Sequence, residues 1–268
     1  KAKMSASLEL TNVQLNDTSD NNSINKDLSV VGPGDIVGIS TKAIVRTEPK
    51  KGVMNYEANS LPYVEFYDED FIWRFTPAAA SKNTARETRL RPWLALVVLK
   101  EDEFTFRKVT DGLSYISINP SSFDTAFHSE KDHWAFGHVH LNNILEHTTG
   151  DPLLTEIRNE LKADPDSGVC RLLCPRKLAK TTSYHAFLIP AFETGRLAGL
   201  GLPIDGIKAQ APSWKKGAMP ASDKRPYDFP VYHFWNFHTA AHGDFESLAA
   251  ALKPIIPDSE SGKMPMDI

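Results

Sequence analysis

Three histidines that lie close together are the residues of this chain best suited to bind a metal ion. They are His133, His138 and His140, in the segment Asp-His-Trp-Ala-Phe-Gly-His-Val-His. In a strand, His138 and His140 would share one face, and two imidazoles at that spacing can bind one zinc or iron ion when a carboxylate joins them. Glu146 and His147 are near enough in sequence to assist. The chemistry would be that of a metal-dependent hydrolase.

A structural interpretation of the same segment competes with the metal site. Trp134, Phe136 and Val139 would belong to a packed strand, with the histidines as polar tips or hydrogen-bonded ends. The spacing matches no metalloenzyme motif, and matches this loose arise mainly by chance. We therefore favour the structural interpretation and predict neither a metal ion nor another cofactor.

A cysteine nucleophile is the second possibility, with Cys174 activated by His185 and Glu193 orienting the imidazole. However, Cys174 follows two leucines and precedes Pro175, a context typical of a buried, inert thiol. Serine chemistry has no support either, because the sequence contains no Gly-X-Ser-X-Gly elbow.

Three further polar segments have structural interpretations. The acidic run 68–70 could bind calcium or magnesium, but it lacks the other ligands of such loops and is better read as a solvated hairpin tip. The glycine-rich run 195–201 follows a predicted helix, so we expect a helix end and a turn rather than a phosphate loop. Arg86, Arg89 and Arg91 could meet an anionic partner or form ion pairs beside a strand.

Composition and charge exclude some classes of protein. The chain has 268 residues, 41% of them hydrophobic, with 30 basic and 34 acidic side chains. The basic residues are scattered, so we expect no nucleic-acid partner. No apolar run approaches the roughly 20 residues that a membrane-spanning helix needs. We expect a protein partner or assembly instead.

The two cysteines indicate a reducing compartment. Cys170 and Cys174 would lie roughly 13 Å apart in an extended segment, too far for a disulfide. Pro175 disfavours the helical backbone that would bring them closer. We therefore expect free thiols and a cytoplasmic location.

The strand that we expect at the centre of the fold is Leu94–Leu99, a continuous apolar run bounded by Pro92 and by Lys100. A run without alternation is typical of a strand that is covered on both faces. Around it we expect further strands at 6–15 with a bulge at Asn12, at 36–46, as two short strands of a hairpin within 62–77, and at 104–107, 113–118, 184–189 and 231–239, with a mobile loop over 16–27.

Helices are predicted after residue 120. Asp151 as N-cap with Pro152 behind it begins a helix whose apolar stripe ends near Ala163. Further helices are expected over 190–198 and from Asp244 to Leu252, and 201–230 should be a long ordered loop. The fold class is therefore α+β, mostly antiparallel sheet with two or three packed helices. We expect a β-rich subdomain over 1–120 and an α+β subdomain over 121–268 that continues beyond residue 268 in a longer protein.

Several segments together resemble a known group of proteins. They are 89–99 (RLRPWLALVVL), 134–139 (WAFGHV), 173–178 (LCPRKL) and 184–200 (YHAFLIPAFETGRLAGL), with 230–232 and 243–248. The chain resembles, over most of residues 60–268, a group of large bacterial proteins of unknown activity associated with phage-tail-like contractile injection gene sets. The resemblance implies an assembly component and transfers no catalytic residue.

The leading hypothesis is a non-enzymatic structural or binding module of a larger bacterial protein. It would use the aromatic strands and the proline-rich 201–230 segment for contacts. The alternatives are a metal-dependent hydrolase built on the three histidines and a delivered toxin or effector fragment.

Overall fold

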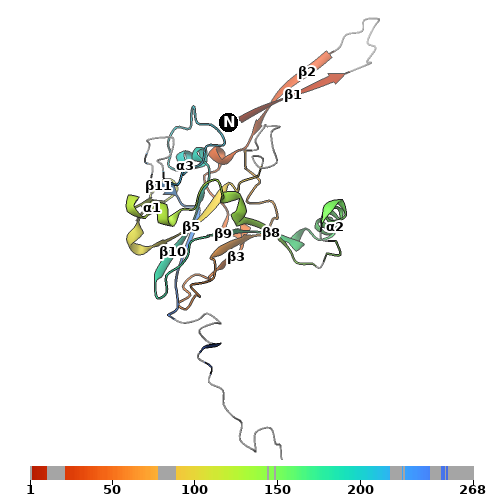
Figure 1. Cartoon of the computed structure of the whole chain (residues 1–268). Coiled ribbons are helices and arrows are strands. Elements are labelled where there is room, and N and C mark those ends of the chain that lie inside the picture. The colour runs from red at the N-terminus through yellow and green to blue at the C-terminus, as the bar shows by residue number, and fades with distance from the viewer. Residues whose placement is uncertain are drawn as a thin grey trace, which may run out of the picture.

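The computed structural model describes residues 2–10, 22–77, 89–143, 145–147, 149–217, 225, 227–241, 249–250 and 252. In these residues three α-helices and twelve strands, all paired antiparallel, confirm the predicted α+β class (Figure 1). The strands are β1 (Ala2–Leu10), β2 (Asn22–Val30), β3 (Ile44–Glu48), β4 (Tyr63–Phe66), β5 (Leu94–Lys100), β6 (Phe104–Arg107), β7 (Tyr115–Ile118), β8 (Gly137–Leu141), β9 (Gly168–Leu173), β10 (Ser183–Pro190), β11 (Asp228–Pro230) and β12 (His233–His238). The helices are α1 (Pro120–Ala126), α2 (Gly150–Ala163) and α3 (Glu193–Gly199).

Three sheets make up the body of the molecule. Their strand orders are β12-β10-β5, β3-β4-β9-β8 and β11-β7-β6, and each joins strands from both sides of residue 120. Interstrand hydrogen bonds therefore join the part of the chain before residue 120 to the part after it. Buried side chains from Tyr56 to Phe237 form one continuous apolar cluster between the sheets.

Strand β5 is buried as predicted, but its place in the sheet differs from the prediction. Every residue from Leu94 to Leu99 has an exposed fraction of 1% or less. The central strand is nevertheless β10, which pairs with β5 on one side and β12 on the other, so the prediction that β5 is central is wrong. Complete burial does not show that a strand is central in its sheet. The free edge of β5 is covered by side chains from other segments, as described below.

Two predicted loops contain strands. Strand β2 begins at Asn22, inside the predicted loop 16–27, and β11 lies inside the predicted loop 201–230. Residues 25–27 are exposed. Their polar side chains, which suggested a loop, therefore belong to a solvent-exposed strand. The predicted bulge at Asn12 lies outside the described residues.

Two predicted strands are wrong in part. Residues 41–43 form a 3₁₀ turn, and β3 begins only at Ile44. The second strand of the hairpin predicted within 62–77 is instead a series of turns over 69–75, with the Phe71 and Trp73 amides donating to Asp68 and Asp70 carbonyls. The aromatic alternation of the sequence is not reflected in burial, because the turns bury the neighbours Phe71 and Ile72 and leave Trp73 half-buried.

The strands predicted at 104–107, 113–118, 184–189 and 231–239 are confirmed as β6, β7, β10 and β12, with tighter bounds for β7 and β12.

Helix α2 confirms the prediction of a helix near 151–163, although its N-cap is Thr149 rather than Asp151. Helix α2 lies apart from the sheets, and none of its residues is buried (Figure 1). Helix α3 begins at Glu193, not at Pro190, because Pro190 completes β10. The start of the helix predicted from Asp244 lies outside the described residues. Among the described helices, none is long and apolar enough to cross a membrane.

Candidate functional site

A hydrogen-bonded pair of imidazoles, with His133 buried and His128 part-buried, is the part of the structure most like a catalytic site. His133 lies in the short 3₁₀ helix His133–Phe136, and His128 follows α1. The Nε2 atom of His133 is 2.9 Å from the Leu94 carbonyl oxygen, and its Nδ1 atom is 2.9 Å from Nε2 of His128. A carbonyl can only accept, so His133 carries its proton on Nε2 and accepts the His128 Nε2–H at Nδ1.

The surroundings keep both imidazoles neutral. Trp214 packs edge-on against both rings and donates from its indole Nε1–H to the His128 carbonyl at 2.9 Å. Burial lowers the pKa of His128 to about 4, with Lys216 lowering it further and Glu130 opposing. Burial lowers the pKa of His133 to about 3, and the electrostatic interaction between the two imidazoles adds to this effect. Imidazoles with pKa values this low are neutral at pH 7 but are weak general bases, because the best catalytic pKa lies near the operating pH.

The described structure leaves no room for a substrate beside His133. The space bounded by Arg91, Phe192, Pro212 and Trp214 beside His133 is too small for a water molecule. Arg91 closes it by donating to the Gln210 carbonyl at 2.8 Å and stacking on Phe192. Burial lowers the pKa of Arg91, with Glu130 opposing. The arrangement is that of a hydrogen-bonded core.

The three histidines proposed as metal ligands do not converge. His133 is buried and bound to Leu94, whereas His138 and His140 are exposed on β8, opposite Arg171 and Val169 of β9. In the part of the chain that the structure describes, no group of three or more His, Cys, Asp or Glu residues is placed to hold a metal ion.

The predicted helpers Glu146 and His147 lie beside α2. The carboxylate of Glu156 accepts both of their backbone N–H groups and lies 3.2 Å from His147 Nδ1. These backbone hydrogen bonds lower the pKa of Glu156. Together with Asp151 and Glu160, these residues line an open groove of about 730 Å³.

The proposed Cys, His and Glu triad is also dispersed. Burial raises the pKa of Cys174 to about 11 and that of Cys170 to about 12, so both are inert thiols, as predicted. His185 packs on Phe104 and lies 3.6 Å from a Glu101 carboxylate oxygen. The carboxylate of Glu193 is held by Arg196.

The acidic run 68–70 binds a cation from its own chain. Arg74 Nη2 donates to Asp70 at 2.5 Å and to Asp68 at 2.8 Å. The hydrogen bond that Arg74 donates to Asp70 is the largest of the effects that raise the pKa of Arg74, against the opposing effect of burial. The run is therefore a solvated turn closed by arginine. Arg89 stacks on Trp134 at 3.7 Å, and Arg86 lies outside the described residues.

The glycines of 195–201 permit close packing of α3. A Cβ atom on Gly199 would lie 2.6 Å from Cγ of Pro230, and one on Gly195 would lie 3.0 Å from Cβ of Pro190. Helix α3 ends at Gly199, and Gly201 has a φ of +70° in the following turn. The predicted helix end and turn are confirmed.

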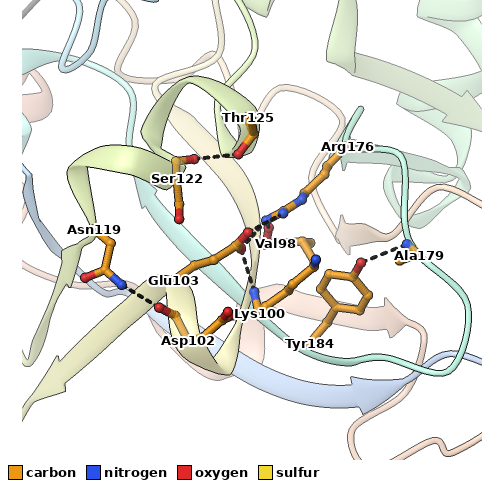
Figure 2. A network of polar contacts seen from close by, with 10 residues as sticks. All are labelled: Val98, Lys100, Asp102, Glu103, Asn119, Ser122, Thr125, Arg176, Ala179 and Tyr184. Atoms are coloured by element: carbon orange, nitrogen blue, oxygen red, sulfur yellow. Dashed lines mark hydrogen bonds and ion pairs between the residues drawn. The ribbon is translucent and has the colours of Figure 1, made fainter.

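An ion pair that the sequence did not single out closes the free edge of β5 (Figure 2). Arg176 binds Glu103 through two parallel hydrogen bonds of 2.6 and 2.7 Å, and its Nη1 also donates to the Val98 carbonyl at 2.7 Å. Glu103 accepts the Lys100 amide at 2.8 Å. The backbone groups bound in this way are the carbonyls of Leu94 and Val98 and the amide of Lys100. These three residues are an even number of positions apart, so their backbone groups lie along the same edge of the strand.

Electrostatics stabilise this closure. Burial would raise the pKa of Glu103, but hydrogen bonds from Arg176 and Lys100 outweigh it and lower that pKa. Burial would lower the pKa of Arg176, but Glu103 outweighs it and raises that pKa. Both groups therefore stay ionised, and charge-assisted bidentate pairs are the stronger class of hydrogen bond.

A second ion pair joins α3 to the strand β11. Glu193 and Arg196 have side chains that are 0% exposed and are linked by hydrogen bonds of 2.7 and 2.8 Å. Arg196 Nη1 also donates to the carbonyls of Arg225 and Asp228. Opposite charges three residues apart in an otherwise apolar turn are the sequence signal for such a pair, since a buried charge needs a partner.

Comparison with known proteins adds no relative: no family model matches the chain, and neither a curated protein nor a solved structure does. The functional argument therefore depends on the geometry of the side chains described above.

Proposed function

We propose that this chain is a non-enzymatic structural or binding module of a larger bacterial protein, acting as a component of a phage-tail-like assembly. The observation that carries the proposal is the use of its buried polar side chains. His133, Arg176 and Arg196 each donate to backbone carbonyls of strands or of the turns that precede them. Catalytic acids and bases must instead reach a substrate.

The segments that carry the resemblance support the same proposal. Residues 89–99 contain β5, 173–178 contain Arg176, and 184–200 contain β10 together with Glu193 and Arg196. These residues form the closed edge of one sheet and the junction of α3 with its neighbours. A framework fastened by buried polar contacts suits a structural component.

Strand β8 offers a surface for a protein partner. It is the last strand of its sheet and pairs only with β9 among the described strands. His138, Val139 and His140 are exposed, with Val139 at 51%. In the 3₁₀ helix that leads into β8, Trp134 is 37% exposed. An open edge beside apolar side chains can accept an extended segment of another protein.

The experiment is recovery of the tagged full-length protein from the source cells, followed by sedimentation. We expect it to enter a particulate fraction with tail-like structural proteins and to leave that fraction when Val139 is changed to lysine. Val109→Lys is the matched control, because Val109 is 41% exposed and lies outside β8. Stoichiometric zinc, iron or manganese that is lost on His138→Ala would contradict the proposal.

A further inference from the structure

The strands β1 and β2 form a ribbon that projects from the body of the molecule (Figure 1). They pair with each other from Ala2↔Val30 to Leu10↔Asn22 and with no other strand of the described structure. Where side chains of the ribbon are described, at 5–7 and 25–30, all are exposed. An isolated two-stranded ribbon is only marginally stable in water, so this one is a candidate for a partner.

The register divides the ribbon into two faces. Even-numbered positions pair with even-numbered positions, so they share one face, and odd-numbered positions share the other. The even positions of β1 are all apolar, and those of β2 include Leu28 and Val30, which are 40% and 43% exposed. The odd positions of both strands are polar or charged. Such a period normally belongs to a half-buried strand, yet the side chains of this face that the structure describes, at 6, 26, 28 and 30, are exposed.

The sequence of β1 is complementary to itself. Read outward from Ala6, it has serine on both sides, then Met4 and Leu8, then Lys3 and Glu9. If two β1 strands pair antiparallel about a two-fold axis through Ala6, position 3 of each copy lies opposite position 9 of the other. A lysine then faces a glutamate twice, and apolar positions face apolar positions. Opposite charges at such positions stabilise a strand pair.

The sequence of β2 disfavours the same arrangement. Its central position is Lys26, so pairing two β2 strands about their centres would place two lysines directly opposite each other, which is destabilising. A lysine on an otherwise apolar face also protects an edge strand from pairing. The edge formed by β1 has neither feature.

We propose that two copies of this chain associate through β1, forming a continuous four-stranded sheet with the order β2-β1-β1-β2. The interface is isologous, because the same strand contributes from each copy. It depends on the ribbon alone and is independent of the function proposed for the body.

The charge pairing is tested by reversal. We expect a concentration-dependent dimer in sedimentation velocity, weakened about tenfold or more by Lys3→Glu or by Glu9→Lys, because symmetry places each change in two like-charge pairs. The double variant Lys3→Glu/Glu9→Lys should restore the dimer. Within the ribbon, Lys3 and Glu9 lie directly opposite Ser29 and Ser23, so reversal places no like charges directly opposite each other. The control Lys26→Glu changes the charge equally but should leave the dimer intact.

A cysteine at the axis tests the register. The native cysteines are both buried, so Ala6→Cys introduces a thiol that alone is accessible. Residues directly opposite in an antiparallel pair are close enough for a disulfide. Under mild oxidation, we expect Ala6→Cys to form a disulfide-linked dimer on a denaturing gel and Lys26→Cys to form none. A monomer at every concentration, a double reversal that fails to restore association, or equal cross-linking of the two cysteine variants would overturn the proposal.

Discussion

Acidification should destabilise this protein through the imidazoles of part-buried His128 and buried His133. Both have a pKa of 6.5 when unperturbed, and burial lowers these values to about 4 and about 3 in the folded state. Below pH 6.5 the unfolded chain therefore binds protons that the folded chain does not bind. The stability contributed by the two imidazoles is complete above pH 6.5 and is lost progressively as the pH falls towards their folded values.

The size of the effect follows from the linkage between proton binding and folding. At pH 5, each imidazole is almost fully protonated in the unfolded chain and almost fully neutral in the folded one. Each then removes about 2 kcal/mol from the free energy of unfolding relative to pH 8, or about 4 kcal/mol for the pair. Domains are stable by roughly 5–15 kcal/mol, so this is a large fraction of the total.

The assay is urea unfolding followed by tryptophan fluorescence at pH 8, 7, 6 and 5. His128→Gln should lower stability at pH 8 but remove about half of the pH dependence, because one titrating group remains. Leu188→Ala is the control: Leu188 is fully buried in β10, so its truncation costs about 2–5 kcal/mol without changing the pH dependence. A free energy of unfolding that is constant from pH 8 to pH 5, or a His128→Gln variant with the full dependence, would refute the reasoning.

Three further changes test how the framework is held together. Arg196→Met removes the buried bidentate ion pair and should cost about 3–5 kcal/mol in urea unfolding. Gly199→Ala places a methyl group 2.6 Å from a proline ring and should cost about 1–3 kcal/mol in the same assay, whereas Gly32→Ala, with no atom within 4 Å, should change stability by less than about 0.5 kcal/mol. Both native thiols should resist a colorimetric thiol reagent at pH 8 until denaturant is added, because burial raises their pKa values to about 11 and about 12; rapid labelling of the folded protein would contradict this.

The sequence predicted those helices and strands that a pattern within the segment itself specifies. The apolar run 94–99 indicated a strand covered on both faces, and its burial is complete. The stripe of α2 indicated a helix, although nothing in it could show that the helix would lie apart from the sheets. The turns at 69–75 were mistaken for a strand because aromatic residues alternated there by coincidence.

The parts that could not be predicted depend on residues distant in the sequence. The free edge of β5 is closed by His133 and Arg176, which follow Leu94 and Val98 by 39 and 78 residues. The pattern of β5 contains no information on these contacts. For the same reason His128 was overlooked while His133 was given the wrong partners. Glu193 and Arg196 could have been identified, because opposite charges three residues apart inside an apolar turn require mutual pairing.

The way the three body sheets are assembled bears on synthesis of the chain. Strand β10 needs both β5, which precedes it by some 90 residues, and β12, which ends at His238. Such distant pairings are slow to form, typically over milliseconds to seconds, and they cannot be completed on the ribosome until residue 238 has left the exit tunnel. Until then Leu188 and its neighbours have one unpaired side, so the nascent chain is expected to need a chaperone that shields apolar strands.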